Sequence, residues 1–296
     1  MNDASLILVT RPVQLAANHP AEQDGFVVAD PHSSQLRVLD LGATRGDGIF
    51  ETVSVTGGHA HALEPHLARF AYSAKLLDLP QPDLDVWRNA VAAAIANHPP
   101  VPEMFVKLVL TRGIEGGDIP TAWVYGEQSG DFSAARTEGI RVVTLDRGYR
   151  HDVAKTSPWL LQGAKTLSYA VNRSAIREAK RRGADDVVFV SSDGFLLEGP
   201  SSTLVLRNGN RIRTPKTDQG ILAGTTQASA FEFFEAEGFE TSFEMIPLDD
   251  LAAADAAWLL SSVRQAAPVR SADGLDLAVD ADLTGRLNDH LLSSPN

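Results

Sequence analysis

A single lysine, Lys165, stands in an otherwise uncharged stretch near the middle of the chain, residues 162–169. A helical pattern begins directly after it. At such a junction the amine of Lys165 can point into a pocket, where the loss of hydration disfavours the ammonium form and the neutral amine can condense with a carbonyl group. Taken alone, the stretch fits a surface lysine at a helix start better. The chemical interpretation therefore depends on the residues that accompany Lys165.

Two further segments carry residue types that suit an acid–base or anionic site. Glu198 ends a short predicted strand, although an isolated glutamate there is usually a solvent-facing loop residue. The residues 224–226, Gly-Thr-Thr, lead into a predicted helix over residues 227–237. The free N–H groups at a helix start, its dipole and two hydroxyls suit a phosphate. Simple capping by threonine explains the same motif equally well.

Arginines and serines elsewhere offer anion-binding groups. Arg69 lies beside the apolar stripe of a helix that Glu64 and Pro65 open, since an acidic residue and proline suit a first turn. Its guanidinium can grip a phosphate or reach along the surface to water, which is the usual case. After a predicted buried strand, Ser262 can complete an anion site and Arg264 can hold a carboxylate.

Glycines on both sides of Asp47 predict a tight loop in which the backbone can approach a ligand closely, although an ordinary turn is the safer interpretation. Three histidines nearby, His59, His61 and His66, raise the question of a metal. His59 and His61 would share one face of a strand, but no carboxylate or third ligand stands at a suitable spacing. We therefore predict no metal site.

Hydrophobic periodicity predicts the elements that must position these residues. The first half reads as strands, a hairpin, two helices and two more strands, and strands, hairpins and helices also follow in the second half. The polar segment 127–139 is predicted as the linker, which gives domains of residues 1–133 and 134–296. Predicted strands cover residues 26–30, 35–41, 49–55, 59–63, 105–110, 122–125, 140–145, 187–190, 195–198, 204–206, 211–213 and 256–260. Predicted helices cover residues 64–77, 85–98, 169–182, 227–237, 249–254 and 282–292.

The composition limits the possible functions. The chain has 296 residues, of which 44% are hydrophobic and 22% charged, as in ordinary globular proteins. A net charge of −12 disfavours nucleic acid as a partner, but a few local arginines can still hold a small anionic substrate. The lack of cysteine excludes disulfides, thiolate metal ligands and cysteine nucleophiles. We expect no signal peptide and no membrane span, and a cytoplasmic location fits.

In their order, these segments resemble the pyridoxal-phosphate (PLP) enzymes of fold type IV, which include branched-chain aminotransferases, D-amino-acid aminotransferases and 4-amino-4-deoxychorismate lyases. The similarity runs from about Phe26 to Gly274, and its best-matching part runs from Lys165 to Thr203. That part contains GADD at residues 183–186 and FLLEG at 195–199, while GDGIFET at 46–52 and ILAGTT at 221–226 match on either side. The resemblance implies an α/β (α+β) fold with a smaller N-terminal α/β domain, a larger C-terminal pseudo-barrel domain and an active site between them.

The resemblance also implies a role for each residue. Lys165 would hold PLP as a Schiff base and later transfer protons, and Glu198 would keep the pyridine nitrogen protonated so that the ring accepts electrons. Tyr169 would donate to the ring phenolate oxygen, although its spacing from Lys165 differs by one residue from that in the branched-chain enzymes. Leu222 would pack on the ring face. The residues implied at the phosphate are Arg69, Gly224, Thr225, Thr226 and Ser262.

Two runs favour one activity within this family. Branched-chain enzymes usually show runs like YGTSVFEG and GTAAEI, whereas this chain has RGDGIFET at residues 45–52 and SSVRQA at 261–266. The RGDGIFET and GAKTLSYAVN runs are most similar to lyase-like members. We therefore expect an aminodeoxychorismate lyase, which forms 4-aminobenzoate and pyruvate on the route to folate. The alternative is an aminotransferase that acts on D-amino acids or branched-chain amino acids.

The expected substrate carries two acidic groups, so arginines should lie near the site. Arg45 and Arg264 are the candidates and Arg112 is a third, with a surface role as the alternative for each. Family members are generally homodimers, so we expect a homodimer. A non-catalytic binding protein on the same scaffold is disfavoured, because both Lys165 and Glu198 are present.

Overall fold

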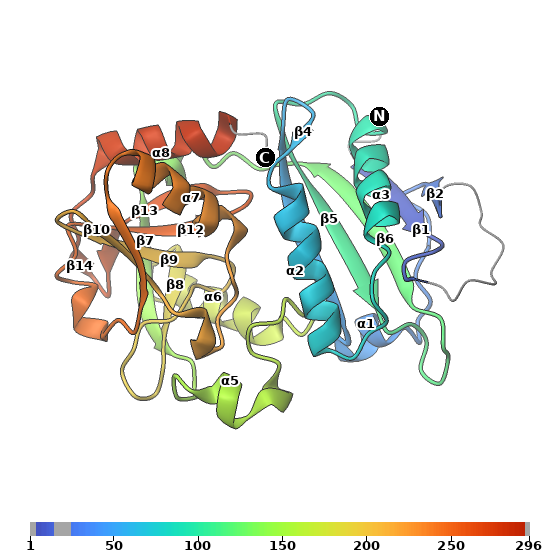
Figure 1. Ribbon diagram of the computed structural model, residues 1–296, viewed down its shortest axis with the longest axis horizontal. Helices are drawn as coiled ribbons and strands as arrows, with labels where there is room; N and C mark the ends of the chain where they lie inside the picture. Colours follow the sequence, from blue (N-terminus) through green and yellow to red (C-terminus); the bar gives the residue numbers. More distant parts are fainter. Residues whose placement is uncertain (1–3, 15–24, 294–296) are drawn as a thin grey trace. The chain divides into compact units, whose positions relative to one another are not determined.

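A computed structural model describes residues 4–14 and 25–293 (Figure 1). These residues form two compact units. Unit 1 contains residues 4–14, 25–130 and Ala164–Tyr169, and unit 2 contains residues 131–163 and 170–293. The segment around Lys165 therefore belongs to the same unit as the first half of the chain. The domains predicted from the sequence, which also include residues outside the described ranges, stay a prediction.

Unit 1 is built on a six-stranded antiparallel sheet. Its elements are β1 (Ala4–Val9), β2 (Phe26–Ala29), α1 (Leu41–Arg45), β3 (Gly48–Thr56), β4 (His59–Ala60), α2 (Leu63–Leu76), α3 (Leu84–Ala96), β5 (Glu103–Thr111) and β6 (Thr121–Gln128). The strand order is β2-β1-β6-β5-β3-β4. Helix α2 packs against β3, and α3 packs against β1 and β6 (Figure 1). The sheet and α2 thus form the support for the residues of GDGIFET.

The helices of unit 1 bury the apolar stripes that their periodicity predicts. Leu67, Phe70 and Ala74 of α2 are fully buried, at the helical spacing of three and four residues. The ring of Phe70 meets that of Trp87 in α3 with its centroid 4.7 Å away. The indole N–H of Trp87 donates to the carbonyl of Pro12 at 2.8 Å, so the polar atom of this buried side chain is satisfied.

Unit 2 is built on a mixed sheet. Its elements are α4 (Ser133–Thr137), β7 (Ile140–Asp146), α5 (Val153–Thr156), η1 (Pro158–Leu160), α6 (Ala170–Arg181), β8 (Asp186–Val190), β9 (Thr203–Asn208), β10 (Arg211–Pro215), η2 (Thr217–Gln219), α7 (Thr225–Ala236), β11 (Glu240–Glu244), η3 (Leu248–Asp250), β12 (Ala256–Ser261), β13 (Gln265–Ala272), β14 (Leu275–Asp276) and α8 (Ala281–Ser293). The strand order is β11-β10-β9-β12-β13-β7-β8, and β14 pairs with β13. The pairs β10–β11, β13–β7 and β7–β8 are parallel. The predicted mixed α/β class is confirmed.

Strand β12 shows why unit 2 has a core on both faces of its sheet. Trp258 and Leu260 pack with Phe234 of α7 and Leu287 of α8. Leu259, which points to the opposite face, joins a second cluster of buried apolar side chains. A strand that is covered on both faces accounts for the continuous apolar run at residues 256–260.

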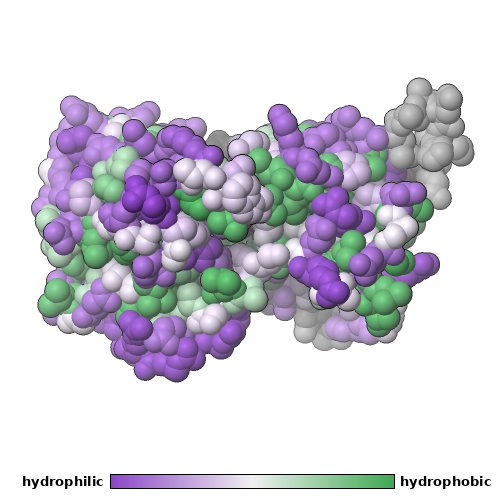
Figure 2. Space-filling view, turned by 90° about the horizontal axis from the view of Figure 1, so that it is seen from below, coloured by the Kyte–Doolittle hydropathy of each residue, from purple (hydrophilic) through white to green (hydrophobic). Residues whose placement is uncertain are grey.

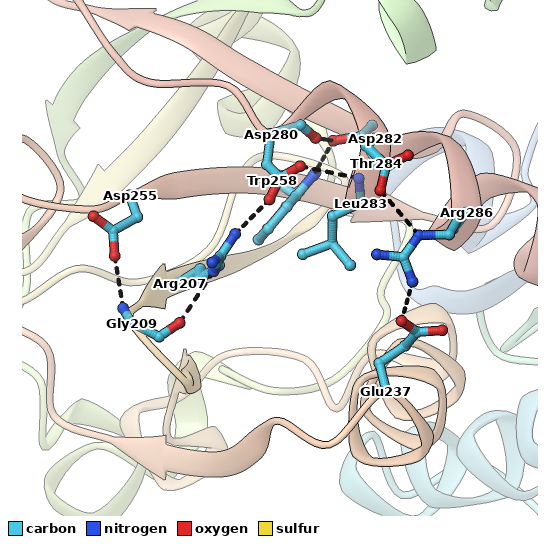
Figure 3. A network of polar contacts seen from close by, with 10 residues as sticks. All are labelled: Arg207, Gly209, Glu237, Asp255, Trp258, Asp280, Asp282, Leu283, Thr284 and Arg286. Carbon is cyan, nitrogen blue, oxygen red and sulfur yellow. Dashed lines mark hydrogen bonds and ion pairs between the residues drawn. The ribbon is translucent and has the colours of Figure 1, made fainter.

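A polar network fastens α8 to this sheet (Figure 3). The indole N–H of Trp258 donates to Thr284 Oγ1 at 2.8 Å. Asp280 caps α8 by accepting the N–H of Leu283 at 3.0 Å, and it pairs with Arg207 of β9. Arg286 of α8 pairs with Glu237, which follows α7 directly. The two C-terminal helices are therefore joined to each other and to β9 and β12.

Some predicted elements differ from the observed ones. Residues 35–39 form no strand, and the predicted range ends at helix α1, where Asp40 accepts the N–H of Gly42 at 2.8 Å. Residues 195–198 form only isolated bridges at Phe195 and Leu196. The predicted helix at 249–254 is the short η3. Strands β1, β11, β13 and β14 were missed. Strand β11 is mostly polar and Pro268 interrupts the β13 pattern.

One face of the molecule is largely hydrophilic (Figure 2). Figure 2 shows a face on which hydrophilic and intermediate residues predominate and hydrophobic residues form small separate groups. No helix among the described residues is both long and apolar enough to cross a membrane.

Candidate active site

Lys165 lies in a short segment that runs alongside the start of β3. The N–H of Phe50 donates to the carbonyl of Lys165 at 3.0 Å, and Ile49 and Thr166 form an isolated antiparallel bridge. The N–H of Lys165 donates to Ser73 Oγ of α2 at 3.1 Å. The Nζ atom lies 4.5 Å from the centroid of the Phe50 ring, whose negative face attracts an ammonium group. Lys165 is therefore held by sheet-like pairing rather than by a helix start.

Tyr169 lies just before α6, which begins at Ala170. Its ring packs edge-on against the ring of Phe50, with a centroid distance of 5.6 Å and an interplanar angle of 87°. Phe50 thus contacts both Lys165 and Tyr169, and all three residues belong to unit 1. The role of the Tyr169 hydroxyl at the cofactor stays a prediction.

Arg69, predicted at the phosphate, is held by a buried carboxylate that sequence reasoning did not single out. Arg69 Nε donates to Glu51 Oε1 and Nη2 donates to Oε2, each at 2.7 Å. Glu51 is fully buried, and the Arg69 side chain is 9% exposed. Burial by itself raises the pKa of Glu51, but the charge and hydrogen bonds of Arg69 and His66 outweigh it and hold that pKa well below its ordinary value. The guanidinium is thus oriented by two parallel bonds.

His66 completes this cluster. Its Nδ1 lies 2.7 Å from Glu51 Oε2, and because an ionised carboxylate only accepts, the proton belongs to Nδ1. Burial lowers the pKa of His66 below its ordinary value, the bond to Glu51 opposes that shift, and the charges of Arg69 and Lys165 add to it. The net shift favours the neutral imidazole. The three cluster residues come from β3 and from one face of α2, a long-range pairing that local patterns do not reveal.

Glu198 and Leu222 come together in unit 2. The N–H of Leu222 donates to Glu198 Oε2 at 3.1 Å. The carbonyl of Glu198 accepts the N–H of Phe189 in β8 at 2.9 Å. The chain after β8 therefore places this carboxylate against the segment before α7, and the roles of Glu198 at the pyridine nitrogen and of Leu222 at the ring face stay predictions.

The start of α7 shows whether a threonine of the Gly-Thr-Thr motif caps this helix. The N-cap residue is Gly224, so no threonine side chain caps the helix, and Thr225 and Thr226 form its first turn. A Cβ at residue 224 would lie 2.4 Å from Thr203 Oγ1. The backbone at this helix start therefore has close polar neighbours and no side chain of its own, the arrangement that suits an anion.

Near this helix start, Gln227 Nε2 is buried without a hydrogen-bonding partner among the described residues. A Cβ at Gly224 would lie 3.1 Å from Gln227 Cβ. Ser262 follows β12, and its carbonyl accepts the side-chain amide of Gln265 at 2.6 Å. The role of the Ser262 hydroxyl at the phosphate stays a prediction.

The candidate substrate arginines have different surroundings. Arg264 Nη2 lies 2.7 Å from Asp186 Oδ2, and both side chains are largely buried. Arg112 donates to Asp47 Oδ2 at 2.7 Å and to the carbonyl of Leu77 at 2.6 Å, so it fastens the loop between the two glycines. Arg45, in the last turn of α1, is exposed. Of the three, Arg45 is the one most open to solvent.

A second cluster near Glu198 was not anticipated from the sequence. Arg147 Nε donates to the Tyr149 hydroxyl at 2.9 Å, and that hydroxyl donates to Gln162 Oε1 at 2.6 Å. Arg147 also stacks 4.3 Å from the centroid of the Phe189 ring. Burial raises the pKa of Tyr149, Arg147 opposes the shift and Glu198 adds to it. The sequence feature that could have indicated this cluster is the RGYR run directly after β7, in which arginines flank a tyrosine.

Within the described parts of the chain, no group of histidine, aspartate and glutamate side chains is arranged to hold a metal ion. Unit 1 carries Lys165, Arg69, Tyr169, Arg45 and Arg112. Unit 2 carries Glu198, Leu222, Gly224, Thr225, Thr226, Ser262 and Arg264.

Comparison with known proteins places the chain in a family. Residues 48–272 match the family described as amino-transferase class IV. A bifunctional aminodeoxychorismate lyase / D-amino acid transaminase from Mycobacterium tuberculosis is 42% identical over 261 residues, which cover 85% of this chain and 90% of the relative. A fold IV transaminase structure from Curtobacterium pusillum has a TM-score of 0.94 and 56% identity, and it covers 99% of this chain and 98% of its own. The PLP-bound form of a hypothetical aminotransferase from Mycobacterium tuberculosis has a TM-score of 0.88 and 38% identity over 99% of this chain and 100% of its own.

The residues of this chain fit PLP, the cofactor of the family. An amine (Lys165), an oriented carboxylate (Glu198) and a helix start without a side-chain cap (Gly224) are the three groups that an aldehyde, a pyridine nitrogen and a phosphate require. The buried Gln227 Nε2, which has no partner among the described residues, agrees with a polar group bound nearby. The chain therefore belongs to the class IV aminotransferase family of fold-type IV PLP enzymes.

Proposed function

We propose that this chain is a PLP-dependent lyase that converts 4-amino-4-deoxychorismate to 4-aminobenzoate and pyruvate. The observation that supports the proposal most is its 42% identity to a relative named for aminodeoxychorismate lyase activity, over 85% of the chain. The RGDGIFET run at residues 45–52 and the SSVRQA run at 261–266, which depart from the branched-chain pattern, support the same choice.

PLP supplies an electron sink for the negative charge left when a proton leaves the carbon that bears the substrate amine. Lys165 would bind the cofactor covalently and, with its amine free, would accept that proton. Glu198, oriented by the N–H of Leu222, would keep the pyridine nitrogen protonated. The enolpyruvyl group would leave and take up a proton to become pyruvate, which leaves the aromatic ring of 4-aminobenzoate.

The ligands predicted for the phosphate are the start of α7 and Ser262 in unit 2 and Arg69 in unit 1. The bonds from Glu51 pre-orient Arg69, so little side-chain freedom is lost when the anion binds. Arg45, which is exposed, is the arginine best suited to attract the acidic groups of the substrate.

A second candidate is transamination of D-amino acids or branched-chain amino acids with the same lysine and cofactor. Two observations favour transamination, and the first favours D-amino acids in particular. The 42% identical relative is named for it together with the lyase activity, and the 56% identical structure is named a transaminase.

The deciding experiment supplies purified holoenzyme with aminodeoxychorismate and, separately, with D-alanine, branched-chain amino acids and 2-oxoglutarate. Equal amounts of pyruvate and 4-aminobenzoate from the first mixture, with no amine transfer in the second, support the lyase alone. Product in both mixtures indicates a bifunctional enzyme, and amine transfer alone contradicts the lyase. The variant Lys165→Ala is the control, because it removes the covalent attachment and should abolish both reactions.

We also propose that the chain acts as a homodimer in the cytoplasm. Sedimentation equilibrium of the holoenzyme tests the first point, since a mass near twice 31.7 kDa is expected. Cell fractionation tests the second.

A further inference from the structure

Helix α2 directs three polar side chains to the interior of unit 1. His66, Arg69 and Ser73 are spaced three and four residues apart, which places them along one face of the helix. His66 is 1% exposed and Ser73 is fully buried. A buried polar group is costly unless it is hydrogen-bonded. His66 and Arg69 bond to Glu51, whereas the bond made by the Ser73 hydroxyl reaches a different segment.

That segment is the one that carries Lys165. Ser73 Oγ accepts the N–H of Lys165 at 3.1 Å, and the carbonyl of Lys165 accepts the N–H of Phe50 at 3.0 Å. The backbone of Lys165 is therefore held on one side by α2 and on the other by β3. The segment Ala164–Tyr169 forms no regular strand or helix of its own. Its conformation depends on such contacts with its surroundings.

We propose that Ser73 is a positioning residue, which fixes the backbone of Lys165 and thereby the direction in which its amine holds the cofactor. The inference rests on the proposed role of Lys165 as the site of covalent attachment. The orientation of a side chain starts from its Cα–Cβ bond, and the backbone bonds on both sides of the Cα atom set that direction. Because α2 also carries Arg69, one rigid helix holds both the lysine backbone and the proposed phosphate ligand.

The substitution Ser73→Ala tests this, because it removes the acceptor and adds no bulk. We expect release of the cofactor to be about fivefold faster, as for the loss of one neutral hydrogen bond. We also expect a smaller visible circular-dichroism signal per unit of absorbance, because that ratio reports how firmly the protein orients the bound chromophore. A contact that only stabilises the fold would change neither quantity.

Ser5→Ala is the matched control. Ser5 of β1 is also buried in unit 1, and its Oγ donates to the carbonyl of Ala94 at 2.7 Å. It has no bond to the segment around Lys165, so its removal should affect thermal stability and leave the cofactor signal unchanged. Equal loss of the signal in both variants would overturn the proposal, as would a Ser73→Ala protein with unchanged release rate and signal.

Borohydride reduction and peptide mapping of the unsubstituted holoenzyme separate this inference from the proposed function. If the label lies on Lys165 and the Ser73→Ala protein behaves as the unsubstituted one does, only the role of Ser73 is wrong. If the label lies on another residue, the attachment at Lys165 is wrong and the role of Ser73 is overturned with it.

Discussion

The carboxylate of Glu51 and the guanidinium of Arg69 meet through two hydrogen bonds of 2.7 Å inside unit 1. Neither side chain is more than 9% exposed. Such a pair is of modest net value to folding, because both charges lose their hydration, but removing one partner leaves the other charge buried and uncompensated. The main effect of the pair is therefore to fix the position of the Arg69 side chain.

Replacement of Glu51 by Gln should be strongly destabilising. The charge of Arg69 then stays buried without its counterion, for which we expect a loss of about 3 kcal/mol or more in the free energy of unfolding. Affinity for PLP should fall as well, because Arg69 is no longer oriented. Urea unfolding of the apoprotein and titration with PLP measure the two effects.

Glu64→Gln provides the comparison for this variant. Glu64 also pairs with an arginine, Arg88, but the two side chains are 60% and 39% exposed. Solvent screens such a pair, so its loss should cost less than about 1 kcal/mol. Equal losses in the two variants would contradict the role assigned to burial.

The stability difference between the unsubstituted protein and Glu51→Gln should depend on pH. The pKa of Glu51 in the fold lies below its ordinary value of 4.5, so its contribution is fully present above that pH and is lost progressively as the pH falls toward the folded value. The difference should therefore shrink below pH 4.5 in thermal unfolding measured across pH. A constant difference would show that Glu51 is not held ionised by the fold.

Replacement of Gly224 by Ala should weaken binding of the cofactor phosphate. The backbone angles of Gly224, φ −75° and ψ 121°, are open to alanine, but the added Cβ would approach Thr203 Oγ1 to 2.4 Å. We expect a stability loss of about 1–3 kcal/mol from this crowding, and a larger loss of affinity for PLP than for pyridoxal, which lacks the phosphate. Equal losses for the two ligands would place the phosphate elsewhere.

The control for this variant is Gly285→Ala in α8. A Cβ at Gly285 would have no atom within 4 Å, so nothing opposes the better helix propensity of alanine. This variant should be more stable by about 0.5–1 kcal/mol and should bind PLP unchanged.

Arg45 and Arg264 should respond differently to replacement by Gln. Arg264→Gln leaves Asp186, which is 2% exposed, without its counterion, and about 3–5 kcal/mol of stability should be lost. Arg45→Gln should leave the melting temperature unchanged and raise the KM for the anionic substrate by about tenfold, as for one charged hydrogen bond. If Arg264→Gln is as stable as the unsubstituted protein and its KM is raised, then Arg264 binds the substrate and the structural role assigned to it is wrong.

Residue types and periodicity were enough to find the helices α2, α3 and α7 and most strands, because the apolar spacing of an element is a local property. The same holds for the order of Lys165, Glu198 and the glycine–threonine run, from which the family was recognised and then confirmed over residues 48–272. The chemistry of PLP requires an amine, an acid and a phosphate site, and these requirements are visible in residue types.

Only the tertiary structure decided which side chains pair with one another. Any carboxylate can pair with any guanidinium, so the sequence could not show that Arg69 bonds to Glu51, Arg112 to Asp47 and Arg264 to Asp186. Nor could it show that the segment of Lys165 returns to β3 and α2 of unit 1, because the contacts that hold it join residues about a hundred positions apart. Such contacts depend on how the chain folds back on itself, whereas the chemical groups that they bring together were already present in the sequence.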